Sequence, residues 1–433
     1  MRDKFKVPFS NLNFDKWQNL LLVALFFFYL SQFGFQYAKD GFLVGYGVDY
    51  LAFWSAGRIA DDKGYAEIYD LENLRSIQNQ VLETYHMVEK GIESNIQTFP
   101  APILSFFIIP FQLLSRVNPK QSYWIWTSIN LAVLIGYLFF FLRRTFPVNT
   151  PLSSAKQMLL LMLLSFPVFV SLTEGQVEVF LVVCMGEFIR CALNKKPLLS
   201  GIWLGGLVLK PQLLIIIIPV LIIQKNWKVL LGFFASSGLI IGSSFILSGL
   251  RGMRSLIELW FHYDAGIATS SPERMINWQM IAVNLNSTLG WVIAILGMAL
   301  TILAIYFLVK GNHVYGTSQW VITMLGIFSA TLAITWHSHF HMAVVLIPLL
   351  IYCSLSQMLN NKIVVFWAIV TPLVLIAMIL IALLVFFLTK MKINEIGVMI
   401  LGFSGFFANL VILISAVQYL RKKKYNFRST RPG

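Results

Sequence analysis

Charged residues are scarce in this chain. Of its 433 residues, 12% are Asp, Glu, Lys or Arg, whereas 58% are hydrophobic. Soluble globular proteins carry about 25% charged residues, so this chain has too little polar surface to cover a water-soluble particle. The same numbers exclude an intrinsically disordered chain, which combines low hydrophobicity with high net charge. The composition therefore excludes a soluble enzyme and indicates an integral membrane protein.

Cysteine is also rare. The three cysteines, Cys184, Cys191 and Cys353, lie inside apolar runs and form no spaced framework, which excludes a disulfide scaffold. Only helices and closed barrels satisfy the backbone hydrogen bonds in lipid. The apolar runs are continuous rather than alternating, which disfavours a barrel. We therefore predict an all-α polytopic membrane protein.

The net charge of +14 comes from short basic clusters beside the apolar runs. In a soluble protein such an excess would suggest nucleic acid, but this distribution is typical of the positive-inside rule, in which Lys and Arg mark cytoplasmic ends. We expect no nucleic-acid partner. Because basic residues lie near both chain ends, in Arg2–Lys6 and Arg421–Lys424, we expect both termini in the cytoplasm.

Apolar runs long enough to cross a bilayer, about 20 residues, recur along the chain and predict a bundle of roughly 10–12 transmembrane helices. Proline interrupts the runs 99–117 and 198–223. If every run crosses, Arg143–Arg144 and Lys195–Lys196 fall on the outer side, against the charge rule. We therefore predict that the first interrupted run dips into the membrane, or lies along it, and returns. The second should be broken near Lys210, as in helices that line cavities.

Two long polar segments, residues 36–98 and 248–288, are predicted on the extracytoplasmic side. Both are far longer than an ordinary connection. Within the first, Val48–Ile59 predicts a juxtamembrane helix, and its Tyr50, Phe53 and Trp54 suit a membrane interface. No internal repeat or low-complexity linker is visible, so we expect one membrane-embedded domain over residues 1–433.

Asp49 stands at the start of this predicted helix. Its carboxylate is suited to act as a general base on a hydroxyl group near the membrane surface. An acidic residue at this point is also typical of a helix cap. Position alone favours the cap.

Three of the six histidines, His337, His339 and His341, lie within five residues at a junction between apolar runs. Their functional interpretations are metal ligation, proton transfer and phosphate binding; the alternative is a polar interfacial turn. Ionisable groups at the edge of a bundle are costly to bury and are usually functional. A metal is less favoured, because no acidic pair lies near them in sequence.

Two further polar positions interrupt apolar sequence. Lys210 either snorkels to the nearer surface or binds an anionic headgroup from a pocket, and we favour the pocket. The stretch Thr173–Glu178 contains Glu174, Gln176 and Glu178. It is equally well interpreted as an ordinary turn or as part of a site.

In these stretches the sequence resembles the polyprenyl-phosphate-dependent glycosyltransferases of the GT-C fold, and in particular glycosyltransferase family 87, the alpha-mannosyltransferase-like membrane proteins. The resembling stretches are Asp49–Trp54 with Arg58, Gly64–Asp70, Thr98–Pro102, Gly175–Glu178, Leu209–Pro211 and Thr335–His341. Ala101 and Glu178 depart from the family pattern, and the histidines are spaced differently.

The resemblance implies a GT-C-like bundle that moves a hexose, mannose in the best-known case, from a polyprenyl-monophosphate donor to a lipid- or glycan-linked acceptor. It implies Asp49 as the general base, with the donor phosphate near Lys210 and the histidines His337, His339 and His341. Weaker candidates for substrate contacts are Arg58, Glu174, Gln176, Arg274 and Asn277. We also expect the bacterial inner (plasma) membrane, no cofactor and, from the residues near the histidines, no metal.

Two other functions fit a chain of this kind. A lipid-linked sugar flippase or transporter would share broken helices and intramembrane charges, but would need no base. A polymerase or ligase of the O-antigen type would use a diphosphate-linked donor. No phosphate-cradling glycine loop and no Ser-His-Asp motif is present, so an enzyme of this build would draw its energy from an activated, lipid-borne substrate.

Overall fold

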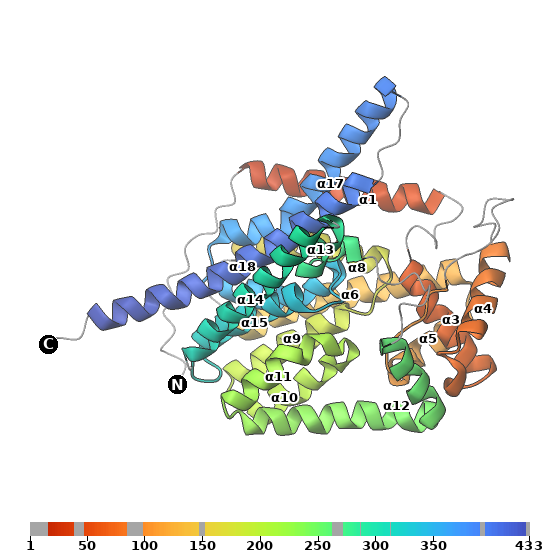
Figure 1. Ribbon diagram of the computed structural model, residues 1–433, viewed down its shortest axis with the longest axis horizontal. Helices are drawn as coiled ribbons and strands as arrows, with labels where there is room; N and C mark the ends of the chain where they lie inside the picture. The colour runs from red at the N-terminus through yellow and green to blue at the C-terminus, as the bar shows by residue number, and fades with distance from the viewer. Residues whose placement is uncertain are drawn as a thin grey trace.

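The computed structural model describes residues 16–38, 47–84, 98–146, 152–261, 272–285, 287–311, 313–389 and 395–429. Every regular element in these ranges is an α-helix or a 3-10 helix, which confirms the predicted all-α class (Figure 1). Residues 1–15 and 430–433 lie outside the described ranges, as does the N-terminal basic cluster on which the predicted orientation depends.

Five helices among the described residues are long and apolar enough to cross a membrane: α6 (Pro119–Thr145), α12 (Trp227–Phe261), α14 (Thr288–Lys310), α17 (Asn361–Thr389) and α18 (Glu395–Ser429). A sixth crossing arises if α7 (Leu152–Leu163) and α8 (Phe166–Thr173), which meet at 47°, form one bent span. The long helices turn apolar side chains outward; Leu239 and Ile246 of α12 are 72% and 83% exposed. Such a surface suits lipid rather than water, and the chain is an integral membrane protein.

Further apolar helices complete the bundle: α1 (Lys16–Ala38), α9 (Val179–Leu193), α10 (Pro197–Gly205), α11 (Leu214–Ile223), α15 (Ser318–Ile334), η6 (Phe340–Leu346) and α16 (Ile347–Leu355). Helices α15 and α16 form the centre of the bundle, and their side chains from Trp320 to Ala333 and from Ile347 to Leu355 are buried. An all-round apolar helix in the core needs no polar face.

Both runs that proline interrupts are broken in the structure. Residues 99–117 form only η2 (Ser105–Ile108) and α5 (Ile109–Leu114), which are too short to cross. In the second run, η3 (Gly206–Leu209) and η4 (Pro211–Leu213) separate α10 from α11. The break falls at Lys210, whose backbone is non-helical (φ −132°, ψ 80°). A residue before proline is disfavoured in the α region, so Pro211 explains the position of the break.

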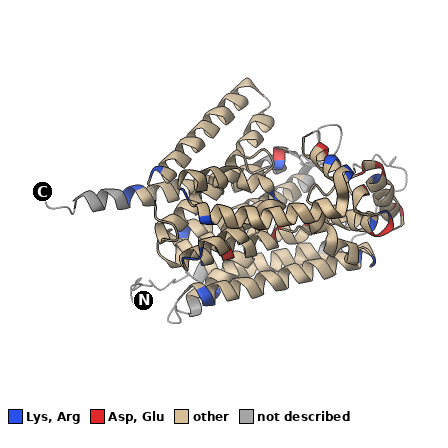
Figure 2. Cartoon of the chain, turned by 90° about the horizontal axis from the view of Figure 1, so that it is seen from below, with Lys and Arg blue, Asp and Glu red and all other residues tan. Residues whose placement is uncertain are grey.

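Part of the first polar segment folds into α3 (Val48–Asp62), η1 (Tyr65–Glu67) and α4 (Leu71–Thr84), which lie with α5 at one end of the molecule (Figure 1). Acidic residues gather at this end, whereas the long helices are nearly free of charge (Figure 2). The predicted helix at Val48 is confirmed, but its aromatic residues are not displayed at a surface. Tyr50, Phe53 and Trp54 are buried, because α3 is enclosed by α4, α5 and α6.

The second polar segment is more helical than its composition indicates. Helix α12 continues through it to Phe261, with a break in φ/ψ at Gly249 (φ 62°), and η5 (Pro272–Arg274) and α13 (Trp278–Leu285) follow. The end of α12 packs on the first segment and on the residues just after it: Arg251 is 2.7 Å from Glu67, and the Trp260 indole donates to the Pro102 carbonyl at 2.9 Å. The two long segments therefore lie side by side, and residues 262–271 are outside the described ranges.

Candidate functional site

The turn between α8 and α9 carries the polar side chains of the site, and α6 holds it in place. The Tyr123 hydroxyl donates to the carbonyls of Leu172 and Thr173, each at 2.9 Å. The Trp126 indole donates to the Gly175 carbonyl at 2.9 Å, and the Asn130 amide to the Gln176 carbonyl at 3.1 Å. Buried carbonyls need such donors. This turn is therefore a rigid platform for Glu174, Gln176 and Glu178.

The start of α3 packs directly against the α8–α9 turn. The Tyr50 amide donates to the Glu174 carbonyl at 3.0 Å. Gly175 has φ +67°, and a Cβ there would lie 2.6 Å from the Tyr50 Cβ. Both the left-handed backbone and the close approach require glycine. This contact fixes Asp49, the residue before Tyr50, over the turn.

Asp49 is not a helix cap. The N-cap of α3 is Gly47, and no side chain makes a capping hydrogen bond there. The Asp49 carboxylate instead accepts a hydrogen bond from the Gln176 side-chain amide. The interpretation that position alone favours is therefore wrong, because Asp49 points to a partner that lies far away in sequence.

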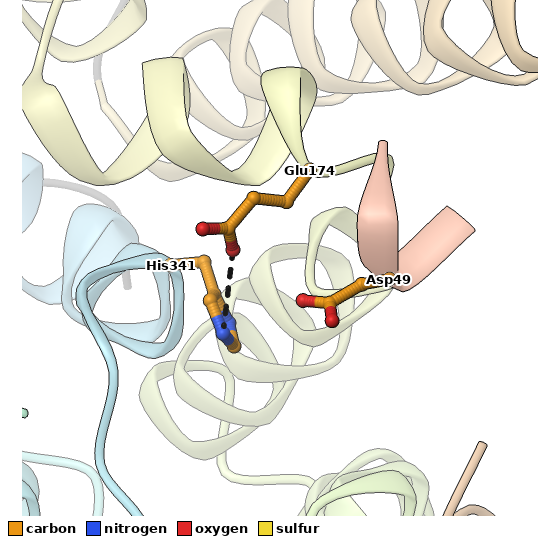
Figure 3. A group of neighbouring side chains, drawn as sticks. All are labelled: Asp49, Glu174 and His341. Carbon is orange, nitrogen blue, oxygen red and sulfur yellow. Dashed lines mark ion pairs between the residues drawn. The ribbon is translucent and has the colours of Figure 1, made fainter. Parts of the chain in front are cut away.

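His341, at the start of η6, is buried against the same turn. Its Nδ1 lies 3.0 Å from Glu178 Oε1, its Nε2 lies 3.8 Å from Glu174 Oε2, and Gln176 Nε2 is 3.5 Å from the same ring nitrogen. Figure 3 shows the imidazole and the carboxylates of Asp49 and Glu174 turned toward one space. Of the three histidines, His341 is thus the one that reaches Asp49.

Lys210 enters the site from the break between η3 and η4. Its Nζ lies 3.0 Å from Glu178 Oε1, and its side chain is 12% exposed. The lysine therefore points into the protein and does not snorkel. Glu178 is fully buried and joins Lys210 to His341. We call Asp49, Glu174, Gln176, Glu178, Lys210 and His341 the Asp49–His341 cluster.

The rings of the other two histidines lie next to the cluster, one after the other. The His339 ring stacks on His341 with centroids 5.7 Å apart, and the His337 ring meets His339 edge-on at 4.8 Å. Asn277 is buried and donates to the Thr335 carbonyl at 2.7 Å. Asn277 therefore supports the backbone that carries the histidines. Arg274 is exposed, three residues earlier in the chain.

Arg58 lies outside the cluster. Its Nε is 2.8 Å from Asp62, and both side chains are about two-fifths exposed. Nine residues of helix separate it from Asp49, a rise of roughly 13 Å. The structure thus gathers Asp49, Lys210, Glu174, Gln176 and His341, and leaves Arg58 at the far end of α3.

The surroundings of Asp49 affect its protonation. Desolvation raises the pKa of Asp49, while the charges of His341 and Lys210 and the hydrogen bond from Gln176 oppose the rise. A carboxylate whose pKa is raised is a stronger proton acceptor once ionised. Such tuned groups are typical of functional sites.

The sequence places Glu178 in the same polar interruption as Gln176 but does not single it out as a site residue. It also shows no acidic pair near the histidines. The fold provides one, because ligand atoms of Asp49, Glu174 and His341 all lie within 4.8 Å of one another.

The family model of glycosyltransferase family 87 matches residues 100–335 of the chain. No curated protein and no solved structure gives a significant match. The matched range covers more than half of the sequence and includes the α8–α9 turn and Lys210. The chain is a membrane-embedded glycosyltransferase and belongs to glycosyltransferase family 87.

Proposed function

We propose that this glycosyltransferase moves a hexose, in the first instance mannose, from a polyprenyl-monophosphate donor to a lipid- or glycan-linked acceptor hydroxyl. The reaction takes place at the extracytoplasmic face of the bacterial inner membrane, and both termini of the chain are cytoplasmic. The absence of a glycine-rich phosphate loop from the sequence favours a lipid-borne donor over a nucleotide sugar.

One observation carries this proposal: Asp49, Lys210 and His341 belong to one cluster although they are far apart in sequence. Glu178 lies 3.0 Å from both Lys210 and His341, and Gln176 contacts both His341 and Asp49. A transferase needs its base on one side of the anomeric carbon and its cations near the leaving group. This arrangement supports both roles within one site.

The proposed step is a single inverting displacement. Asp49 takes the proton of the acceptor hydroxyl as its oxygen bonds to the anomeric carbon. The bond between that carbon and the phosphate oxygen breaks, and polyprenyl phosphate leaves with the electron pair. Lys210 and His341 stabilise the charge that grows on the phosphate, with His339 and His337 behind them; such preorganised groups lower the barrier.

The remaining sequence candidates take supporting roles in the proposal. Glu174 and Gln176 line the space beside Asp49 and are available to sugar hydroxyls. Arg274 and Asn277 contribute from the second polar segment, Arg274 as an exposed cation and Asn277 by holding the histidine backbone. Arg58 is the weakest, because Asp62 already pairs with it.

The proposal is tested with purified protein and two synthetic short-chain donors, a prenyl-monophosphate mannose and a prenyl-diphosphate mannose, against a panel of acceptors. We expect transfer from the monophosphate donor. Transfer from the diphosphate donor alone indicates a polymerase or ligase. Movement of the donor across vesicles without transfer indicates a flippase.

A further inference from the structure

The Asp49–His341 cluster contains more negative than positive groups. Asp49, Glu174 and Glu178 supply three carboxylates, while Lys210 is the one permanent cation and already pairs with Glu178 at 3.0 Å. His341 adds a positive charge only when it is protonated. Three carboxyl groups therefore meet one permanent cation here, and a bound cation would stabilise their ionised forms in a low-dielectric setting.

The geometry offers such a cation its ligands. Asp49 and Glu174 each contribute a carboxylate oxygen and His341 a ring nitrogen, and these atoms lie within 4.8 Å of one another. Figure 3 shows that all three face the same space. Mg²⁺–oxygen bonds of about 2.0–2.1 Å place ligand atoms at most roughly 4.2 Å apart, so a bound cation would draw the three side chains slightly closer together.

A buried oxygen of Gln176 gives an independent indication that a cation binds in this space. Gln176 is 3% exposed, and its Oε1 is buried without a hydrogen-bond partner. Its amide lies between Asp49 and His341. In the structure the amide nitrogen faces this space and donates to Asp49. With a cation bound, a half-turn of the amide would give up that hydrogen bond and present the oxygen as a neutral ligand.

Glu178 contacts His341 and is not itself one of the proposed cation ligands. It lies 3.0 Å from Nδ1 of His341, whereas Nε2 of the same ring faces Glu174 at 3.8 Å. Histidines that bind metals are typically oriented by a carboxylate in this way.

We propose that Asp49, Glu174 and His341 bind a divalent cation of the Mn²⁺ or Mg²⁺ class, with Gln176 as a fourth ligand. A set rich in oxygen with one imidazole suits these ions. One oxygen of Asp49 binds the cation and the other faces the acceptor. The further role of the cation, to draw the donor phosphate toward the carboxylates, rests on the proposed function; the binding itself does not.

The test uses the full-length purified protein, stripped of metal with a chelator and titrated with Mn²⁺ while the free ion is followed by electron paramagnetic resonance. We expect one saturable site per chain. Glu174→Gln and His341→Gln should each weaken binding at least tenfold, and Glu178→Gln about 10–100-fold. The matched control is Glu258→Gln, an exposed residue of α12, which should bind as the unaltered chain does.

Folding is checked by gel filtration and by thermal unfolding with and without Mn²⁺. The ion should raise the unfolding temperature of the unaltered chain and of Glu258→Gln, but not that of Glu174→Gln. The absence of a saturable site, or equal affinity in Glu174→Gln, overturns the proposal. If Mn²⁺ binds saturably but sugar transfer continues after chelation, the cation site is supported and only its proposed role toward the donor phosphate is overturned. Binding without any transfer counts against the proposed function instead.

Discussion

The ammonium group of Lys210 lies 3.0 Å from a carboxylate oxygen of Glu178. The same oxygen is 3.0 Å from His341 Nδ1, so one buried acid fixes two positive or polar groups from different parts of the chain. Glu178 therefore organises the site, although it stands where the family resemblance leads one to expect a neutral residue.

Lys210→Met should destabilise the protein, because it leaves Glu178 buried without its lysine. Removing one partner of a buried pair costs about 3–5 kcal/mol. The double variant Lys210→Met, Glu178→Gln should recover much of that loss, since neither charge remains. Thermal unfolding in detergent checks this, with Lys228→Met at an exposed site of α12 as control. Additive losses in the double variant would mean that the two residues are not coupled.

Gly175→Ala should damage the site through the backbone. The new Cβ would lie 2.6 Å from the Tyr50 Cβ, at a residue with φ +67°. We expect a loss of roughly 1–3 kcal/mol in stability and a fall in transfer, because α3 can no longer seat Asp49 on the turn. Gly136→Ala in α6, where no atom lies within 4 Å of the added Cβ, is the matched control. An unchanged unfolding temperature in Gly175→Ala would contradict the close packing of α3.

Arg58→Gln should alter transfer only slightly. Its partner Asp62 is half-exposed like Arg58 itself, and such surface pairs contribute about 0–1 kcal/mol. We expect the transfer rate to change by less than about fivefold on that basis. Steady-state kinetics with the monophosphate donor check this. A loss as large as that of Lys210→Met would place Arg58 in the substrate site after all.

The elements of the fold follow from local sequence more closely than the site does. Apolar runs predict the helices, and Pro211 predicts the break at Lys210, because both effects act over a few residues. The extension of α12 to Phe261 was not predicted, since polar residues such as Arg251 and Arg254 suggest a loop. That extension is stabilised by packing on η1 and η2, which are distant in sequence.

The site depends on contacts that no local pattern encodes. Local sequence favours Asp49 as a helix cap, but the N-cap of α3 is Gly47. The partner of Asp49 is Gln176, which is 127 residues away in the sequence. In the sequence Glu178 is a departure from the family pattern, whereas in the structure it contacts both Lys210 and His341. The spacing of the three histidines could not show which one reaches Asp49, because the turn of η6 decides it. The sequence did name Asp49, Lys210 and the histidines as candidates, but it could not show that they meet at the polar interruption Glu174–Glu178.

The central claim is that Asp49 is the base of a sugar transfer, and Asp49→Asn tests it most directly. The rate of mannose transfer from a prenyl-monophosphate donor is compared in the unaltered protein, in Asp49→Asn and in Asp62→Asn, an acid at the exposed end of the same helix. The account predicts a loss of about 10²–10⁴-fold in Asp49→Asn and a near-normal rate in Asp62→Asn. A folded Asp49→Asn protein that transfers mannose at the normal rate would contradict it.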